Sequence, residues 1–298
     1  MTVQVDKSNH HVKISTLALL TACVLLLVPS PAARALELQP TRGSPYDLAV
    51  TGRLAGVPAG ETRYVPWAEL RALPVARLRL RDEFVPGEQE VTVVVLDELG
   101  RALPCGPGAD VLLAACNDDY ASVFTRDFIR RCRPFLVLEI DGAGPAHWPL
   151  PGWKFDPGPY AILISSAVVP GADALLDASH KKPWGVVAIE VASYAERFHD
   201  SFSGRWAALS PRAQAGRELW INSCASCHPG PGRTYGGTKS VQAFPTLAAL
   251  ATVRPDFFAA YVRHPQALVA NATMPAHGHY SDAQLAALIA FVTAEPAK

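Results

Sequence analysis

The sequence predicts a multidomain protein in which a mixed α/β domain precedes an all-α domain. Before about residue 195, short β-branched stretches alternate with Gly, Pro and Asp clusters, a pattern typical of strands and turns. From Pro211 onward, apolar residues recur at three- and four-residue spacing, which is typical of amphipathic helices. The chain has 298 residues, enough for two ordinary domains. We place the boundaries at residues 1–35, 36–195, 196–210 and 211–298.

The first 35 residues have the three parts of an export signal. Lys7 and Lys13 give a positive start, and an apolar stretch covers residues 17–28. Ala33 and Ala35 then offer small side chains at the two positions that a signal peptidase inspects. The apolar stretch is shorter than the ~20 residues that a membrane-spanning helix needs. We therefore expect residues 1–35 to be a cleaved signal peptide. Lipidation at a nearby cysteine and retention as an uncleaved anchor are the alternatives.

Composition limits the class of partner. The chain has 27 basic and 27 acidic residues, so its formal net charge is zero. A nucleic-acid partner that is recognised through a strong basic field is therefore not expected.

Nine segments of residues 36–195 have the pattern of a strand or a helix. We expect strands at Tyr46–Thr51, Ala76–Leu80, Glu90–Leu96, Val111–Ala115, Pro134–Glu139, Ala161–Ser165 and Val186–Val191. We expect helices at Pro66–Ala72 and Thr125–Arg131.

The last region has three helix signals. Ser210 and Pro211 are suited to begin a helix over Arg212–Ser223, because serine caps helices and proline favours the first helical position. Pro255 opens a second helix, Asp256–His264, and Ser281 caps a third one. Residues 196–210 form the linker, although its aromatic side chains suggest that it packs onto a neighbour.

The most informative motif is the C-x-x-C-H run formed by Cys224, Cys227 and His228. This spacing is the attachment signature of a c-type haem. Two thiols form thioether bonds to the porphyrin vinyl groups, and the imidazole becomes the proximal iron ligand. A zinc or redox motif is the alternative. The export signal argues against it, because covalent haem attachment takes place outside the bacterial cytoplasm.

Met274 is the candidate for the second axial ligand, because it lies in an Ala-Thr-Met-Pro loop downstream of the motif. A thioether is a soft ligand that stabilises reduced iron. His264, His277 and His279 are rivals, although we expect all three to be ordinary surface histidines. With both axial positions filled by protein, the iron would serve outer-sphere electron transfer rather than substrate chemistry.

Several further residues surround the motif, namely Gly216 and Trp220 before it, the segments Phe244–Leu247 and Asn271–Pro275 after it, and Phe291 in the last helix. With these features, residues 211–298 resemble a class I cytochrome c along their full length. The resemblance implies one covalent haem c anchored by Cys224 and Cys227. It also implies that His228 and Met274 are the axial ligands, and that Gly216 permits a close crossing of the first and last helices.

A second resemblance is carried by four segments, Asp47–Gly52, Trp67–Pro74, Asn117–Tyr120 and Gly158–Tyr160. With them, residues 36–195 resemble the molybdopterin-binding domain of the sulfite oxidase type. Members that hold molybdenum supply a cysteine thiolate after an early strand, and the comparable stretch here, residues 76–86, has no cysteine. We therefore interpret the domain as lacking molybdenum and as serving in docking. A metal-ligating Cys105 is the alternative.

Other residues of this region have plainer interpretations. Asp118 and Asp119 are adjacent acids of the kind found in solvated turns. Cys105, Cys116 and Cys132 are an odd number of thiols, so at least one stays unpaired and the pairing is open.

These observations predict a periplasmic monohaem c-type cytochrome that carries single electrons between a periplasmic dehydrogenase and a respiratory acceptor. The acceptor would be a terminal oxidase or another cytochrome. We interpret the chain as an electron-transfer protein or redox subunit rather than a stand-alone enzyme, and we assign no catalytic residue. The alternative is a molybdopterin-dependent sulfite-type dehydrogenase with a fused haem c domain, or the haem subunit of such an enzyme. A membrane contact would arise only through an uncleaved signal.

Overall fold

The computed structural model describes residues 35–82, 85–153, 157–172, 181–233 and 235–295. The export signal expected at residues 1–35 lies outside the described residues except for Ala35. The described residues from Ala35 onward belong to one compact unit. No helix within these ranges combines the length and the apolar character needed to cross a bilayer.

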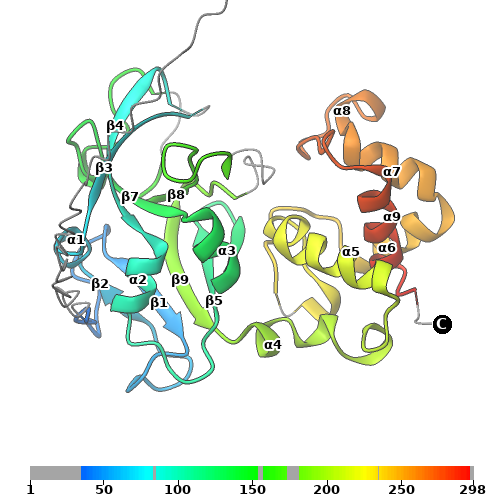
Figure 1. The fold of residues 1–298 in the computed structure, drawn as a ribbon, viewed down its shortest axis with the longest axis horizontal. Coiled ribbons are helices and arrows are strands. Elements are labelled where there is room, and N and C mark those ends of the chain that lie inside the picture. Colours follow the sequence, from blue (N-terminus) through cyan, green and yellow to red (C-terminus); the bar gives the residue numbers. More distant parts are fainter. Residues whose placement is uncertain (1–34, 83–84, 154–156, 173–180, 234, 296–298) are drawn as a thin grey trace, which may run out of the picture. The chain divides into compact units, whose positions relative to one another are not determined.

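The first sheet has five strands in the order β2-β1-β9-β5-β6 (Figure 1). Its members are β1 Leu48–Gly52, β2 Arg63–Val65, β5 Val111–Cys116, β6 Ala121–Thr125 and β9 Val186–Ala192. Only the β1–β9 pair is parallel. Strand β9, the last of the described strands, therefore lies at the centre of the sheet, where it pairs with β1 on one side and β5 on the other.

The second sheet has four antiparallel strands in the order β3-β4-β7-β8. These are β3 Ala76–Arg81, β4 Glu88–Val95, β7 Phe135–Ile140 and β8 Ala161–Leu163. Three short helices accompany the sheets, namely α1 Trp67–Arg71, α2 Leu96–Ala102 and α3 Arg126–Cys132. Helix α3 begins where the Thr125 side chain accepts a hydrogen bond from the Phe128 N–H, at 3.2 Å.

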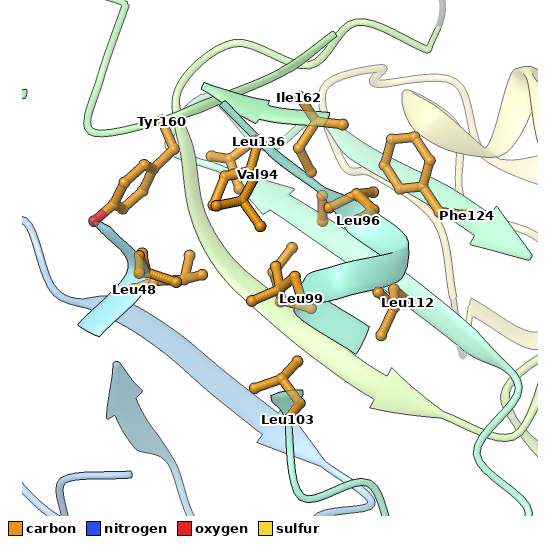
Figure 2. Close-up of a cluster of buried hydrophobic side chains, with 14 of the residues drawn as sticks. Leu48, Val94, Leu96, Leu99, Leu103, Leu112, Phe124, Leu136, Tyr160 and Ile162 are labelled. Atoms are coloured by element: carbon orange, nitrogen blue, oxygen red, sulfur yellow. The ribbon is translucent and has the colours of Figure 1, made fainter. Parts of the chain in front are cut away.

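Both sheets and α2 contribute side chains to the first hydrophobic core (Figure 2). Leu48 of β1, Leu99 of α2 and Leu136 of β7 are completely buried in it. Each such side chain contributes on the order of 2 kcal/mol through burial. The Tyr160 ring closes one side of this core, and its hydroxyl donates a hydrogen bond to the Tyr46 carbonyl at 2.6 Å.

The β5–β6 hairpin is buried on both faces. Leu112 pairs with Phe124 across the hairpin, and both belong to the first core. The next pair, Leu113 and Val123, points the other way and belongs to the core of the helical region. Alternation along a strand sends successive side chains to opposite faces. The hairpin is therefore shared by two cores, which explains why β5, Val111–Cys116, is a continuous apolar run.

The helical region contains α4 Tyr194–Arg197, α5 Pro211–Asn222, α6 Phe244–Val253, α7 Pro255–Arg263, α8 Pro265–Leu268 and α9 Asp282–Val292. Its caps follow the sequence signals. Ser210 accepts a hydrogen bond from the Ala213 N–H at 3.1 Å. Ser281 and Gln284 form a reciprocal capping box at the start of α9.

Most elements predicted from the sequence are present, with ends within a few residues. Strands β2 and β6 and helices α2, α4, α6 and α8 were not predicted. Leu96 was placed in a strand, whereas it begins α2. The error has a physical source, because an apolar run from Val93 to Leu96 crosses the end of the strand and Val95 carries no capping side chain. Periodicity therefore gave no signal for the change from strand to helix.

The segment 196–210 packs into the helical core instead of running free. Phe198 is fully buried and Leu209 is 3% exposed. Phe202 and Trp206 are partly buried against the same core, as the aromatic side chains in the sequence suggested. The segment therefore belongs to the packing of the helical region.

Helices α5 and α9 cross at Gly216. A Cβ atom on this residue would lie 1.8 Å from the Ala287 carbonyl oxygen and 2.9 Å from the Leu288 nitrogen, both in the backbone of α9. Next to the crossing, Trp220 of α5 lies 6.2 Å from Phe291 of α9, measured between ring centroids. The close crossing expected from the sequence is confirmed.

Lys181 is buried where the hairpin meets the helical region. Its side chain is 2% exposed. The ammonium donates hydrogen bonds to the Val123 carbonyl of β6 and, at 3.3 Å, to Asn222 at the end of α5. It also lies over the rings of Phe124 and Phe128, at 5.5 and 4.8 Å from their centroids. A cation thus joins β6, α3 and α5.

The Gly216→Ala change should destabilise the full-length protein. The added methyl group meets rigid backbone, so α5 and α9 must separate, at a cost of about 1–3 kcal/mol. Urea unfolding measures this loss. Gly100→Ala on α2 is the matched control, because its Cβ would meet only a Leu112 methyl group at 3.9 Å. The control should be neutral or up to about 1 kcal/mol more stable. Equal stability of the two variants would contradict the tight crossing.

The Lys181→Met change should alter how stability depends on pH. Burial lowers the pKa of Lys181 from 10.5 to about 7 in the folded protein. Between pH 7 and pH 10.5, Lys181 is protonated in the unfolded chain but not in the folded protein, so its contribution makes the free energy of unfolding rise with pH. Below about pH 7, Lys181 is protonated in both states and adds no pH dependence. We expect the Met variant to be more stable than the parent at pH 7, with a smaller difference at pH 9.5. Urea unfolding at both values tests this. A difference that does not change with pH would contradict the depressed pKa.

Candidate haem-attachment site

The C-x-x-C-H run folds as a single tight turn directly after α5. The helix ends at Asn222, and residues Cys224–Ser226 form a 3₁₀ turn. The Cys227 N–H and the His228 N–H both donate to the Cys224 carbonyl, at 3.2 and 2.9 Å. One turn of backbone therefore holds both thiols and the imidazole together, as haem attachment requires, and both thiols are free.

His228 is half-buried beside Trp220, with 6.0 Å between the ring centroids. Its Nδ1 atom is buried and has no hydrogen-bond partner among the described residues. Burial lowers the pKa of His228, the Gln242 backbone opposes this shift, and the nearby His277 adds to it. The imidazole is therefore held neutral, which is the form that binds a metal.

Burial also raises the pKa of both thiols. The pKa of Cys224 rises to about 12. For Cys227, burial is again the main cause, while Lys239 lowers its pKa and Asp118 raises it. Lys239 is next in sequence to Ser240, whose N–H donates to the Cys227 carbonyl at 2.9 Å, and it pairs with Asp118.

Met274 lies on a loop that is tied to α8. Its side chain is half-buried and packs against the helical core. The Gln266 side-chain amide donates to the Ala272 carbonyl at 3.1 Å and to the Met274 carbonyl at 2.8 Å. Gln266 therefore fixes the backbone of this loop. Sequence analysis missed it, because a helical glutamine carries no signal of the carbonyl groups that it reaches.

The loop after Met274 leads to the histidine rivals. The expectation that all three are surface residues is wrong for His277, which is 3% exposed. Its N–H donates to the Val262 carbonyl at 3.0 Å, and its ring lies 4.9 Å from that of Tyr280. Met274 of this loop and Cys224 of the motif pack against the same core. His264 and His279 are exposed, as expected.

The loop after His228 returns to the motif. The Gly237 N–H donates to the Ala225 carbonyl at 2.7 Å, and the Ser240 N–H donates to the Cys227 carbonyl at 2.9 Å. A Cβ on Gly237 would lie 2.1 Å from the Ser226 carbonyl oxygen. Glycine is therefore required for the loop to lie flat against the motif.

The tip of the β5–β6 hairpin contacts this loop. The Asp118 carboxylate pairs with Lys239, and the Thr238 N–H donates to the Asp119 carbonyl at 3.1 Å. Asp119 has a φ of 65°, which places it in the left-handed region. The two aspartates were expected in a solvated turn. Both are exposed, yet the turn is also an anchor for the haem-attachment loop.

Haem c fits this set of side chains. Two free thiols, a neutral imidazole with an unsatisfied buried nitrogen and a half-buried thioether are the donors that a His/Met haem c needs. An aromatic wall stands beside them, with Trp220 and Phe244 rings 4.9 Å apart and Phe291 behind. The three rings are at most 2% exposed and belong to the core that supports the motif.

The three other described cysteines are also unpaired. Cys105 is exposed, and its thiol donates to the Gly100 carbonyl at 3.5 Å, whereas Cys116 and Cys132 are buried. In this structure Cys105, Cys116 and Cys132 form no disulfide, and each is a free thiol. Strand β3, where the cysteine of a molybdenum domain would be sought, is made of Ala, Arg and Leu.

Residues 211–292 match a family model described as cytochrome C oxidase, cbb3-type, subunit III. No curated protein matches the chain. The family match covers the region that holds the C-x-x-C-H turn and Met274, and it leaves residues 36–195 unassigned. The resemblance of those residues to a molybdopterin-binding domain therefore stays a prediction. The helical C-terminal region is a cytochrome c-type domain, which implies haem c.

Proposed function

We propose that this protein is a monohaem c-type cytochrome that carries single electrons between two redox partners outside the cytoplasm. A haem c electron-transfer role is supported by the cytochrome c-type domain. The observation that carries the proposal is the turn in which Cys224, Cys227 and His228 are held around one carbonyl. Met274 packs against the same core as Cys224 and Ala225 of this turn.

Each side chain has a defined task. Cys224 and Cys227 would bind the haem covalently, and His228 and Met274 would supply the protein ligands of its iron. Gln266 orients the methionine loop through two hydrogen bonds. Haem c supplies a one-electron iron couple when bound. With His228 and Met274 as iron ligands, the chain would serve electron transfer without a substrate bound to the metal.

The partners follow from the same chemistry. A one-electron carrier needs a donor and an acceptor, and we assign a periplasmic dehydrogenase and a terminal oxidase or second cytochrome to these roles. Periplasmic location rests on the export signal in the sequence. The balanced formal charge gives no reason to invoke nucleic acid.

The α/β domain would then position the haem domain rather than perform chemistry. A second candidate function is a sulfite-type dehydrogenase in which molybdopterin in residues 36–195 feeds the haem. The exposed thiol of Cys105 is the observation that keeps this candidate. One equivalent of molybdenum in protein made by a host that synthesises molybdopterin would favour it.

Exported mature protein should carry one haem. We expect its intact mass to exceed that of the chain from Leu36 by one haem, and its pyridine haemochrome spectrum to be that of two thioether bonds. A Cys224→Ala/Cys227→Ala variant should lack the added mass and serves as the control. Parent protein without covalent haem, or ferrous protein that binds carbon monoxide readily, would rule out the proposed carrier.

Met274→Ala should lower the reduction potential and abolish the weak sulfur-to-iron band at the red edge of the visible spectrum. The reason is that a soft thioether stabilises ferrous iron. Potentiometry and ferric spectra measure both effects. His279→Ala is the control, because that side chain is exposed on the same loop. If the Met274 variant keeps the band while His277→Ala alters the spectrum, the distal ligand has been assigned wrongly.

A further inference from the structure

The tip of the β5–β6 hairpin lies against the haem-attachment loop, although the two belong to different domains. Asp118, between β5 and β6, pairs with Lys239, which is 121 residues away in the sequence. The neighbouring Asp119 carbonyl accepts a hydrogen bond from the Thr238 N–H at 3.1 Å. Asp118 and Asp119 of the turn thus contact Thr238 and Lys239 of the loop.

The same loop forms backbone hydrogen bonds with the haem motif. Ser240, next to Lys239, donates its N–H to the Cys227 carbonyl at 2.9 Å, and Gly237 donates to Ala225 at 2.7 Å. The turn and the motif are therefore separated by a single layer of backbone. Within that layer Lys239 is the residue whose charge faces the carboxylate of Asp118.

The hairpin that carries this turn is packed on both faces. The two faces of the hairpin are buried in two cores. Lys181 donates hydrogen bonds both to the Val123 carbonyl of the hairpin and to Asn222 of α5, which lies just before the motif. The α/β domain therefore contacts the chain both before the haem motif, at Asn222, and after it, at Lys239. A turn that is anchored in this way holds its charge at a fixed place near the motif.

We propose that Asp118 and Lys239 are a redox-tuning pair, in which a carboxylate of the α/β domain and an ammonium of the haem domain set the reduction potential of the haem from beside the Cys227 backbone. This inference rests on the proposed function, because it needs a haem at the motif. A nearby carboxylate stabilises the more positive ferric state and lowers the potential, and an ammonium does the reverse. Asp118 and Lys239 are half-exposed, so salt should weaken both effects.

The test is a cycle of full-length, haem-loaded proteins carrying Asp118→Asn, Lys239→Met or both. We expect the potential to rise in the first, to fall in the second and to return close to the parent in the double variant. The shifts should shrink as ionic strength increases. Asp97→Asn, which breaks an exposed ion pair with Arg101 on α2, is the matched control and should leave the potential unchanged.

The direction of the shifts separates tuning from simple anchoring. If the pair only holds the loop in place, both single variants lose the same contact and shift the potential in the same direction. Shifts of equal sign, or none, would overturn the proposal. Asp118→Glu, which keeps the charge, should retain the parent potential. The mass of the parent protein is read first, so absence of haem would count against the proposed function and not against this pair.

Discussion

The two-sided burial of the β5–β6 hairpin is the constraint on which the rest of the structure depends. Leu112 and Phe124 face the core between the sheets, whereas Leu113 and Val123 face the helices. A register slip of one residue would exchange these faces. Because the same strands close two cores, apolar packing as well as polar contacts sets the position of the haem motif relative to the sheet.

Sequence signals were most accurate where structure is local. The C-x-x-C-H turn needs only five consecutive residues, and the caps at Ser210 and Ser281 act within three residues. The crossing at Gly216 could be expected because the cytochrome c resemblance supplied its partner helix. These features depend on short-range geometry or on a known family, so they can be inferred without a structure.

The remaining features depend on pairs that are distant in the sequence. Asp118 and Lys239 are 121 residues apart, and Lys181 reaches Asn222 from 41 residues away. Neither lysine belongs to a motif, and an Asp-Asp turn is ordinary at a hairpin tip. His277 was assigned to the surface for the same reason, since the burial of a polar side chain is decided by the elements that fold over it.

The division of the chain by composition also differs from its division by packing. The pattern changes from strands to helices near residue 195, which suggests two independent domains. However, Val111 and Ala192 from the first sheet lie in the same core as Trp220 and Phe291. A haem domain cut out at residue 211 would expose that apolar surface and lose the wall that the hairpin provides. The α/β region is therefore part of the fold that holds the haem motif, and a role for it in haem properties requires no additional contact beyond those already present.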